Sequence, residues 1–560
     1  GRKEQVIDGF TIEDGAINTT NRRVFRDQPR KLMRVFLLMQ RHSLRLHPDL
    51  AQIIRQQVWL VDRAFREDPH VHETFLEILN HPGAVGRILR RMHELDLLGK
   101  FLPEFGRLTC LVQHEFYHQY TVDEHTLVCL EKLDGLWEET WPDYRRYHEV
   151  FEEIERPSTL YLALLLHDSG KGIETDHHER EGARVAEHVA DRIGLDEAAA
   201  DSLRLIIRHH LTMVQVAQRR DLEDPQVIEQ FAEEMETEEN LNLLMLHTLA
   251  DSLGTSDDLW NGFKDTSQWS LFWKTRALFR EGPVAVRAEE EERAEIEAEV
   301  TKLIGDKVPA EEITAHFEQL PMRYFRASPA DEIAEDIGLV HEFIRLQIAF
   351  DDRMLEPAVE WQRDRDRGYA VASICTWDRP GLFSRITGVL AQCGLNILSA
   401  QIFTRGDSMV LDHFRLTDAR TGQLPTGEQR AQFTERLKPA LAAHEDPDLD
   451  LAELPDSGIE YTSLTGEHIP TEIYFDNRSS AEFTVLDLEA EDHVGLLYAV
   501  THTLNALGLT IELARINTEK GGANDSFYLT DIDGEKVEDE SRQQFIESML
   551  RHVIAALHEA

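Results

Sequence analysis

The sequence predicts a multidomain protein of the α plus α+β class, in which a long all-helical region precedes two tandem βαββαβ units. Three observations support this fold class. Apolar residues recur at helical spacing as far as about residue 364, and the first clear alternation of a β-strand comes only at residues 369–374. The residues that follow repeat at a constant offset. A chain of 560 residues is also too long for one hydrophobic core, so several domains are expected.

The composition is strongly acidic, with 104 Asp and Glu against 59 Lys and Arg and a formal net charge of -45. Phosphate binding needs a clustered basic surface, so we expect no nucleic-acid partner. The four cysteines are scattered and form no CxxC pair, which is typical of a reducing compartment. No apolar run is long enough to span a bilayer and none reads as a secretory signal. We therefore expect a cytoplasmic protein without a membrane partner.

Residues 1–30 and 31–105 are expected to differ in structure. Two short apolar stretches on either side of residues 13–15 read as a small hairpin, which could hardly fold alone. Because the chain also starts at Gly1 rather than at methionine, we expect residues 1–30 to be the edge of a domain that this chain lacks. From Leu32 onward apolar residues recur at helical spacing, which predicts a helical connector over residues 31–105.

Residues 106–285 remain helical in pattern and become rich in histidine. An apolar stretch that starts at Tyr161 ends in the adjacent pair His167 and Asp168, which a glycine turn and Lys171 follow. A hydrophobic helix that ends in two potential metal ligands can hold them rigidly at the edge of a core. This pair is therefore the centre of the predicted site.

Further potential ligands occur in order along this region, each on a helical pattern. The intervals from His125 to His167 and from His209 to Asp251 are each 42 residues, so only the packing of helices can bring these side chains together. A single histidine is more often an ordinary hydrogen-bonded residue than a ligand. An ordered set of imidazoles and carboxylates instead suits a divalent metal used in hydrolysis.

Magnesium or manganese is the expected ion, with iron or zinc as alternatives. The ligands expected for a first ion are His125, His167, Asp168 and Asp251. A second ion is left open, with its candidate ligands among the remaining histidines: His177, His178, His209 and His210.

A second helical connector is expected over residues 286–365, and an internal repeat follows it. The segment 378–383 recurs as 492–497, and residues 394–397 recur as 508–511, both at an offset of 114. Each copy has the pattern of a βαββαβ, ferredoxin-like unit, and two such units would pack sheet beside sheet. The units are expected at residues 366–445 and 480–560.

Several stretches resemble known families. The order of His125, His167, Asp168 and Asp251 is similar to the H...HD...D pattern of the HD superfamily of metal-dependent phosphohydrolases. Longer strings resemble one family, the GlnD proteins, which are bifunctional uridylyltransferase/uridylyl-removing enzymes. These strings are L-P-E-F-G-R (102–107), Y-T-V-D-E-H-T-L (120–127), H-D-S-G-K-G (167–172), D-H-H-E (176–179), A-Q-R-R-D-L-E-D-P-Q-V-I (217–228) and L-W-N-G-F-K (259–264). The resemblance covers essentially the whole chain.

The resemblance implies an HD-type metallohydrolase domain at residues 106–285 and an ACT domain in each repeat. It implies hydrolysis of the phosphodiester that joins UMP to a tyrosine of the nitrogen regulatory protein PII. Uridylylated PII would be the partner and substrate, and glutamine would be the effector that the ACT domains bind.

Two departures from the family pattern matter. The family's amino-terminal nucleotidyltransferase domain, with its Gly-Ser motif and D-x-D metal pair, has no counterpart here, and residues 1–30 resemble only its tail. We therefore expect no transferase activity in this chain. Ser169 and Gly170 stand where the family usually has an apolar residue and alanine, which changes no ligand.

The residues expected to act in this reaction are His125, His167, Asp168, Lys171 and Asp251. A bound metal would lower the pKa of a water molecule, so that hydroxide attacks phosphorus at neutral pH. Lys171 would neutralise charge that develops on the phosphoryl oxygens, or it is an ordinary cation at a helix end.

The helix start in each repeat supplies the expected glutamine site. Asp378 is predicted to cap the first of these helices, with Pro380 in its first turn, while Gly381 lets backbone amides approach a ligand. The complete expected set is Asp378, Gly381, Leu382 and Asn396 in the first copy, and Asp492, Gly495, Leu496 and Thr510 in the second. The alternative is that these residues serve only as cap, turn and packing.

Two other functions remain open. A hydrolase of guanosine polyphosphates would also combine HD and ACT modules, although such proteins place a synthetase and a ubiquitin-like domain between them. A non-catalytic glutamine sensor would lack a metal ligand, and none is missing from this sequence.

Overall fold

The computed structural model describes residues 5–111, 120–138, 144–172, 178–255, 262–282, 289–349, 356–364, 367–443, 469–493, 495–519 and 521–559. The chain forms two compact units. Unit 1 comprises Gly1–Val214 and Glu233–Trp260, and unit 2 comprises Gln215–Ala232 and Asn261–Ala560. The chain therefore passes from one unit to the other three times.

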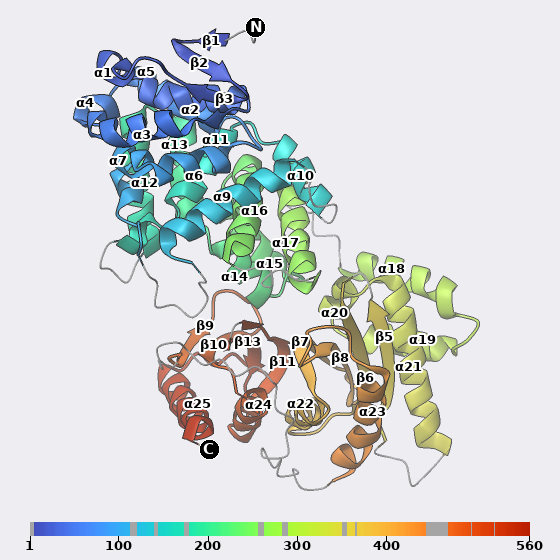
Figure 1. The fold of residues 1–560 in the computed structure, drawn as a ribbon. Coiled ribbons are helices and arrows are strands. Elements are labelled where there is room, and N and C mark those ends of the chain that lie inside the picture. Colours follow the sequence, from blue (N-terminus) through green and yellow to red (C-terminus); the bar gives the residue numbers. More distant parts are fainter. Residues whose placement is uncertain are drawn as a thin grey trace. The chain divides into compact units, whose positions relative to one another are not determined.

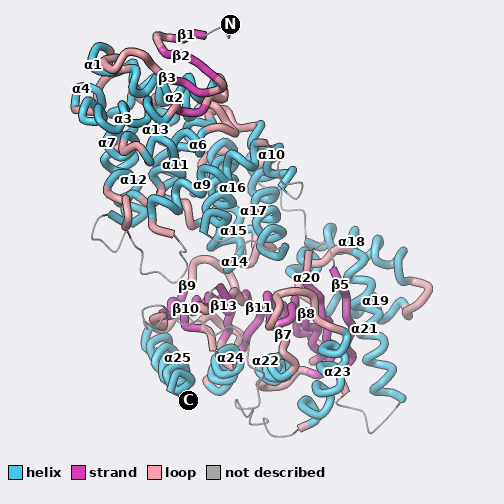
Figure 2. Tube along the Cα trace, in the orientation of Figure 1, coloured by secondary structure: helices cyan, strands magenta, loops and turns pink. Residues whose placement is uncertain are grey.

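Unit 1 begins with a four-stranded sheet in the order β1-β2-β3-β4 (Figure 2). The expected hairpin is confirmed, because β2 and β3 pair antiparallel with Ile12 opposite Ile17. Phe10 and Ile17 are fully buried, so this sheet has its own apolar contacts with the helices beside it. Its strands are β1 Gln5–Ile7, β2 Phe10–Glu13, β3 Ala16–Asn18 and β4 Arg45–Leu46.

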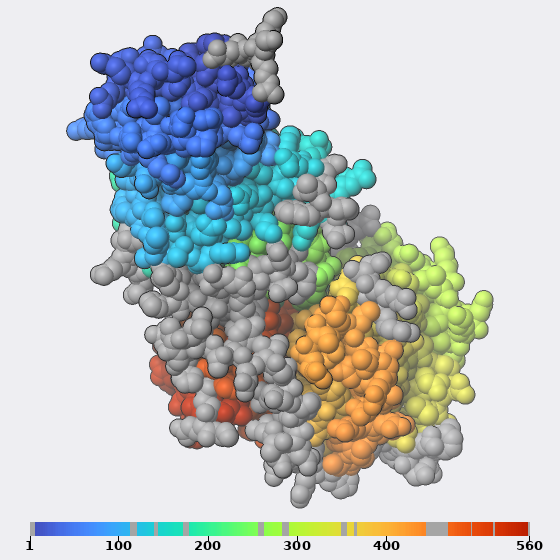
Figure 3. Space-filling view, viewed as in Figure 1, coloured from blue at the N-terminus to red at the C-terminus, as the bar shows by residue number. Residues whose placement is uncertain are grey.

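The remainder of unit 1 is helical, and in the space-filling view its blue and cyan segments form one closely packed surface (Figure 3). The helices before residue 110 are α1 Val24–Asp27, α2 Lys31–Arg41, α3 Pro48–Gln57, η1 Val58–Leu60, α4 Arg63–Arg66, α5 Pro69–Leu79, α6 Val85–Glu94, α7 Leu97–Phe101 and α8 Pro103–Gly106. Those that follow are α9 Val122–Trp137, α10 Arg145–Glu152, α11 Pro157–Leu166, η3 Ser169–Gly172, α12 His178–Ile193, α13 Glu197–Arg208 and α16 Glu238–Thr255. Most residues of α14 Thr212–Arg219 and α15 Pro225–Met235 belong to unit 2.

Helices α9 and α16 pack closely against each other where Gly254 meets Cys129. A Cβ on Gly254 of α16 would collide with the Cys129 side chain of α9, so only glycine allows this approach. On another side of α9, a Cβ on Gly86 would lie 2.7 Å from the backbone nitrogen of Glu131. The packing of α9 thus depends on two glycines that belong to different helices.

Unit 2 combines helices with a nine-stranded sheet (Figure 1). Eight strands follow the order β5-β6-β8-β7-β11-β13-β10-β9, and the ninth, β12, pairs with β13. Its helices are α17 Gly262–Glu281, α18 Glu289–Ile304, α19 Ala310–Gln319, α20 Met322–Ala327, α21 Ala330–Ala349, α22 Leu382–Gln392, α23 Gly427–Ala442, α24 Leu496–Ala506 and α25 Glu540–Glu559. Its strands are β5 Ala358–Asp364, β6 Tyr369–Trp377, β7 Leu395–Thr404, β8 Met409–Asp418, β9 Glu472–Asp476, β10 Thr484–Glu491, β11 Thr510–Arg515, β12 Thr518–Glu519 and β13 Gly522–Thr530.

The predicted fold class is confirmed, with two differences of detail. Residues 358–364 were expected to be helical and instead form β5, because pairing of the whole of β5 with β6 overrides a sequence without strong β character. In each repeat the edge strand, β5 or β9, also comes first in the chain. In the sheet it takes the position that the last strand of a βαββαβ unit would occupy.

The two repeats are related by a local two-fold axis. Strands β7 and β11 pair antiparallel at the centre of the sheet, and Ala400 lies opposite Ala514. On the adjacent helices, the hydroxyl oxygens of Thr387 and Thr501 are 3.5 Å apart. Both pairs join residues that are 114 positions apart in the chain, so each residue meets its own counterpart. The internal repeat is therefore a structural symmetry.

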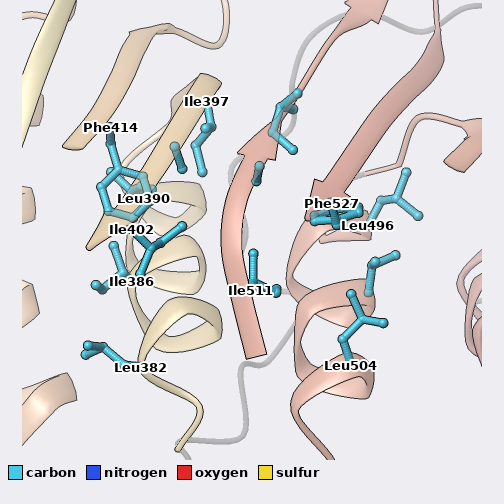
Figure 4. Packing of buried hydrophobic residues seen from close by; sticks show 14 of the residues in the cluster. Leu382, Ile386, Leu390, Ile397, Ile402, Phe414, Leu496, Leu504, Ile511 and Phe527 are labelled. Carbon is cyan, nitrogen blue, oxygen red and sulfur yellow. The ribbon is translucent and has the colours of Figure 1, made fainter. Parts of the chain in front are cut away.

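Helices α22 to α25 cover one face of this sheet. Figure 4 shows apolar side chains of α22 and α24 beside those of the strands. In the first copy Leu390 lies with Ile402 and Phe414, and in the second copy Leu496 lies with Phe527 (Figure 4). Helices α18 to α21 pack on the opposite face of the first copy. The sheet of the first copy is thus covered on both faces.

Residues 215–232 belong to unit 2 because their polar side chains bind the second repeat. The Arg220 guanidinium donates two hydrogen bonds to Asp487, at 2.9 and 2.8 Å. Arg219 donates to Glu489 at 2.7 Å, and the backbone N–H of Asp221 donates to the Tyr528 hydroxyl at 2.6 Å. These contacts fix the segment to the sheet of the second copy.

The helices of the repeats begin later than expected. Gly381 is the residue before α22 and has a φ of +75°, and Gly495 before α24 has a φ of +85°. The prediction that Asp378 caps α22 is wrong, because a left-handed glycine follows it and the helix starts only at Leu382.

Within the described residues, no helix is long and apolar enough to cross a membrane.

Candidate metal centre and ligand pocket

The His167 and Asp168 pair is positioned by α11, whose buried residues lie on every side of the helix. The helix ends at Leu166, and the His167 Nδ1–H donates to the Leu164 carbonyl oxygen at 2.7 Å. This bond leaves Nε2 as the atom that can coordinate a metal. Gly170 in the following turn lies so close to the His178 carbonyl oxygen that a Cβ would collide with it, so the turn requires glycine.

The four residues predicted to hold a first metal come together. The His125 Nε2 lies 3.0 Å from the Asp251 Oδ1 and 3.9 Å from the Asp168 Oδ2. The His167 Nε2 lies 3.3 Å from the Asp168 Oδ2 and 3.5 Å from the Asp251 Oδ1. These side chains come from α9, from the residues after α11 and from α16. Helix packing has thus joined residues that are distant in the chain.

The centre balances two carboxylates against two imidazoles. Burial opposes protonation of His167, but the Asp168 and Asp251 carboxylates outweigh it and raise the pKa of His167 to about 10. Burial also opposes a charge on His125, yet Cys129 and Asp251 raise its pKa well above the usual value. Burial would raise the pKa of Asp168, but His167 and Lys171 hold it well below its ordinary range. A bound divalent cation would take the place of the two protons.

These residues fit a metal ion. One potential ligand atom from each of His125, His167 and Asp168 lies within 4.8 Å of the others, and Cys129 forms a second such group with His125 and Asp251. In the described part of the chain, the buried His167 Nε2 and Asp168 Oδ2 have no hydrogen-bond partner. Buried polar atoms without a partner are costly, and coordination would satisfy both. Imidazole and carboxylate donors suit manganese, iron or zinc, and carboxylates suit magnesium.

The remaining predicted histidines are placed differently from one another. His210 is buried with its ring centroid 5.4 Å from that of His167, so it joins the centre. The His209 Nδ1 instead lies 3.2 Å from the Thr212 hydroxyl, at the start of α14. His178 is exposed, with its Nδ1 3.4 Å from the Gly170 carbonyl oxygen, and His177 lies outside the described residues. The Lys171 Nζ lies 3.0 Å from the Asp168 Oδ1.

His247 was not predicted as a ligand, although it belongs to the same cluster. It is fully buried, and its ring centroid lies 5.2 Å from His167 and 6.0 Å from His210. Neither ring nitrogen has a hydrogen-bond partner among the described residues. Burial and the neighbouring His167 lower the pKa of His247 well below its usual value, so the ring is neutral. Its position one helical turn before Asp251 was the signal in the sequence.

A cavity of about 360 Å³ lies between the two repeats of unit 2. Four of the eight residues predicted to bind glutamine line it, and they come from both copies: Asn396, Asp492, Gly495 and Leu496. The other four do not occur among its lining residues in the described part of the chain: Asp378, Gly381, Leu382 and Thr510. Asp525 also lines the cavity and was not predicted, since a single acid in a strand gives no pattern.

Known families match the chain in four places. Residues 10–101 match the third domain of uridylyltransferase GlnD, and residues 122–255 match the HD domain. Residues 371–431 match the ACT domain, and residues 472–557 match an ACR9-like, ACT-like domain. The first match extends over both sides of the boundary expected near residue 30.

Curated relatives match almost the entire chain. The bifunctional uridylyltransferase/uridylyl-removing enzyme of Azospirillum brasilense is 32% identical over 98% of this chain and 58% of its own length. The chain is homologous to the GlnD proteins. A GlnD enzyme of the same name from a Bradyrhizobium species is 30% identical over 99% of this chain and 58% of its own length. The chain thus spans less than two thirds of the GlnD relatives that it matches.

Among solved structures, chains of CCA-adding enzymes are similar to parts of this GlnD homologue. The apo form II of a CCA-adding enzyme has a TM-score of 0.32 and 16% identity over 54% of this chain and 61% of that chain. The Thermotoga maritima CCA-adding enzyme complexed with tRNA has a TM-score of 0.29 and 16% identity over 54% of this chain and 64% of that chain.

Proposed function

We propose that this chain is a metal-dependent uridylyl-removing hydrolase, which releases UMP from uridylylated PII in the cytoplasm under the control of glutamine. The observation that carries the proposal is the meeting of His125, His167, Asp168 and Asp251 in one buried cluster within an HD domain. The name of the homologues, which includes the uridylyl-removing activity, supports this choice of substrate.

The chain's own residues would prepare the reaction. Bound there, a divalent metal supplies a Lewis acid and a water of lowered pKa. His125, His167, Asp168 and Asp251 would hold it, and the backbone carbonyl of Leu164 keeps the His167 ring in the required tautomer. In the overall hydrolysis, the water oxygen bonds to phosphorus, the bond from phosphorus to the tyrosine oxygen breaks, and a proton goes to that oxygen.

Lys171 is placed to act on the phosphoryl group through its charge. Its ammonium lies 3.0 Å from the Asp168 Oδ1, and its side chain is 17% exposed, so it stands between the buried centre and solvent. A cation in this position would neutralise negative charge on the phosphoryl oxygens as the transition state forms.

Glutamine would bind in the cavity between the repeats. Gly495, at the start of α24, and Asn396, at the start of β7, both line this cavity. The first offers a backbone N–H at a helix start, where carboxylate or amide oxygens bind well, and the second offers a carboxamide. A ligand controls activity only if it binds one state of the protein better than another.

The two alternative functions make different predictions. A hydrolase of guanosine polyphosphates would use the same metal centre but would release pyrophosphate from those nucleotides. A degenerate sensor would lack part of the ligand set, whereas the described residues contain two imidazoles and two carboxylates in contact distance.

The test is incubation of the purified chain with uridylylated PII, with and without glutamine and with and without added manganese or magnesium, while UMP release is measured. We expect metal-dependent UMP release that glutamine changes. The variant His167→Ala/Asp168→Ala should release no UMP while retaining its circular dichroism spectrum. UMP release by that variant at the rate of the parent would overturn the site assignment, and cleavage of guanosine polyphosphates alone would favour the other hydrolase.

A further inference from the structure

The loops that end at Gly381, before α22, and at Gly495, before α24, occupy symmetric positions but have different hydrogen-bond partners. At the first loop, the Gly381 N–H donates a hydrogen bond of 2.8 Å to the Oδ1 of Asn505, which lies in the last turn of α24. The Asn505 carboxamide comes from the second copy and reaches across the local two-fold axis to the first. Gly381 is buried in this arrangement.

The symmetric position has no such group. The counterpart of Asn505, 114 residues earlier, is Ala391 in the last turn of α22, and the counterpart of Gly381 is Gly495. Alanine has no carboxamide that could bind the Gly495 N–H. Ala391 and Gly495 both line the cavity of about 360 Å³, and Gly495 is only partly buried. The cavity therefore lies where the other copy holds the Asn505 side chain.

A second difference points in the same direction. Asn396 lines the cavity at the start of β7, and its counterpart at the start of β11 is the shorter, exposed Thr510. The cavity thus combines a helix-start N–H, a carboxamide and the buried carboxyl of Asp525, which together suit a ligand with both an oxygen acceptor and a cationic amine.

We propose that Asn505 is a built-in substitute for ligand at the Gly381 loop, so that each chain binds a single amino-acid ligand, in the cavity between Gly495 and Asn396. The Asn505 Oδ1 stands for the carboxylate or carboxamide oxygen that a free amino acid would present to Gly495. The identity of that amino acid as glutamine rests on the proposed function, whereas the number of sites and their location rest on the asymmetry of the two loops.

The first test is isothermal titration of glutamine into the full chain, which counts the ligands bound per chain. We expect one. Two equivalent sites would overturn this inference and leave glutamine as effector. An absence of binding up to millimolar glutamine would overturn the glutamine effector and, with it, the occupancy proposed here.

The second test moves the carboxamide to the symmetric position. Ala391→Asn should weaken glutamine binding about tenfold or more, because its side chain would bind the Gly495 N–H. The control Ala506→Asn adds the same group at an exposed position beside Asn505 and should leave binding unchanged. Glutamine affinity of the Ala391→Asn chain equal to that of the parent would contradict the proposal.

A matched pair of alanine variants tests the proposal even if the Ala391→Asn chain does not fold. Asn396→Ala should weaken glutamine binding about tenfold or more, whereas the symmetric Thr510→Ala should leave it unchanged, since only Asn396 lines the cavity. The reverse order of effects would place the ligand at the other loop and exclude Asn505 as its substitute.

Discussion

The Nε2 of His125 lies 3.0 Å from the Oδ1 of Asp251, although 126 residues separate them in the chain. The contact exists because α9 and α16 approach closely where Gly254 faces Cys129. Two helices that share a glycine contact can hold a histidine and a carboxylate at a fixed separation, which a metal centre requires.

If the proposed function holds, Asp251→Asn should remove the bound metal and the hydrolase activity together. The amide keeps the shape of the carboxylate but loses its charge, so the cluster would retain one carboxylate for a divalent ion. UMP release should fall by more than about 100-fold, beyond the 10–100-fold typical of groups that only support a ligand. Metal content and UMP release should be measured on the same sample. The control Asp201→Asn changes an exposed acid on α13 and should alter neither; a fully active Asp251→Asn chain would remove Asp251 from the centre.

His247→Leu should separate a functional from a structural role for this buried ring. Neither ring nitrogen has a hydrogen-bond partner in the described residues, so an apolar side chain of similar size should leave the melting temperature unchanged or raise it. If His247 serves the metal centre, UMP release should fall about 10–100-fold. His188→Leu, at an exposed position on α12, is the matched control. Unchanged activity in the His247→Leu chain would assign the ring to packing alone.

Gly86→Ala should destabilise unit 1 by about 1–3 kcal/mol, because its Cβ would lie 2.7 Å from the Glu131 backbone nitrogen and the helices would have to separate. Gly338→Ala, in the middle of α21, has no atom nearer than the Ile304 Cδ1 at 3.9 Å. This second variant should instead gain about 0.5–1 kcal/mol from the better helix propensity of alanine. Denaturant unfolding of each variant measures both effects, and equal effects would show that the α6–α9 approach is not tight.

Asp525 should make ligand binding depend on pH. Burial, with a smaller contribution from Asp492, outweighs the Asn517 N–H and Arg219 and raises the pKa of this carboxyl to about 7. The group is therefore largely neutral at pH 6 and ionised at pH 8. If it attracts the amine of the ligand, affinity for glutamine should rise as the pH increases through about 7.

The Asp525→Asn chain should lose this pH dependence, which titrations at pH 6 and 8 would reveal. Because the folded-state pKa is raised, the stability associated with Asp525 is present at low pH and is lost as the pH rises through about 7. Asp525→Asn should therefore stabilise unit 2 more at pH 8 than at pH 5, by up to roughly 3 kcal/mol. Asp533→Asn, which is exposed, is the control, and the same gain at both pH values would argue against a raised pKa.

The meeting of His125, His167, Asp168 and Asp251 could be predicted because their order follows the HD pattern, and because each lies on or directly after a helical segment. Their role as metal ligands stays a prediction. His247 was not predicted to belong to the cluster, because a histidine one turn before an acid is also typical of an exposed pair on a helix surface. Only the packing of α16 into the centre of unit 1, where almost all its residues are buried, turns that face inward.

Candidate ligand residues could be predicted within each repeat, but the sequence did not show which residues of the two repeats line one cavity. An internal repeat gives equivalent positions, such as Asn396 and Thr510, without showing which loop faces which strand. The pairing of β7 with β11 decides that Asn396 shares a cavity with Gly495 rather than with Gly381. The start of α22 was placed too early because Asp378 and Pro380 form a common helix-start pattern, which the left-handed Gly381 interrupts.

The passage of residues 215–232 into unit 2 limits how this protein can be recombined. A fragment that begins at residue 261 and is fused to another protein would lack Arg220, the bidentate partner of the mostly buried Asp487. An acid deprived of its partner in such a place destabilises the module that carries it. Chimaeras of this protein would therefore need to keep the two repeats together with a short segment from within the region that matches the HD domain.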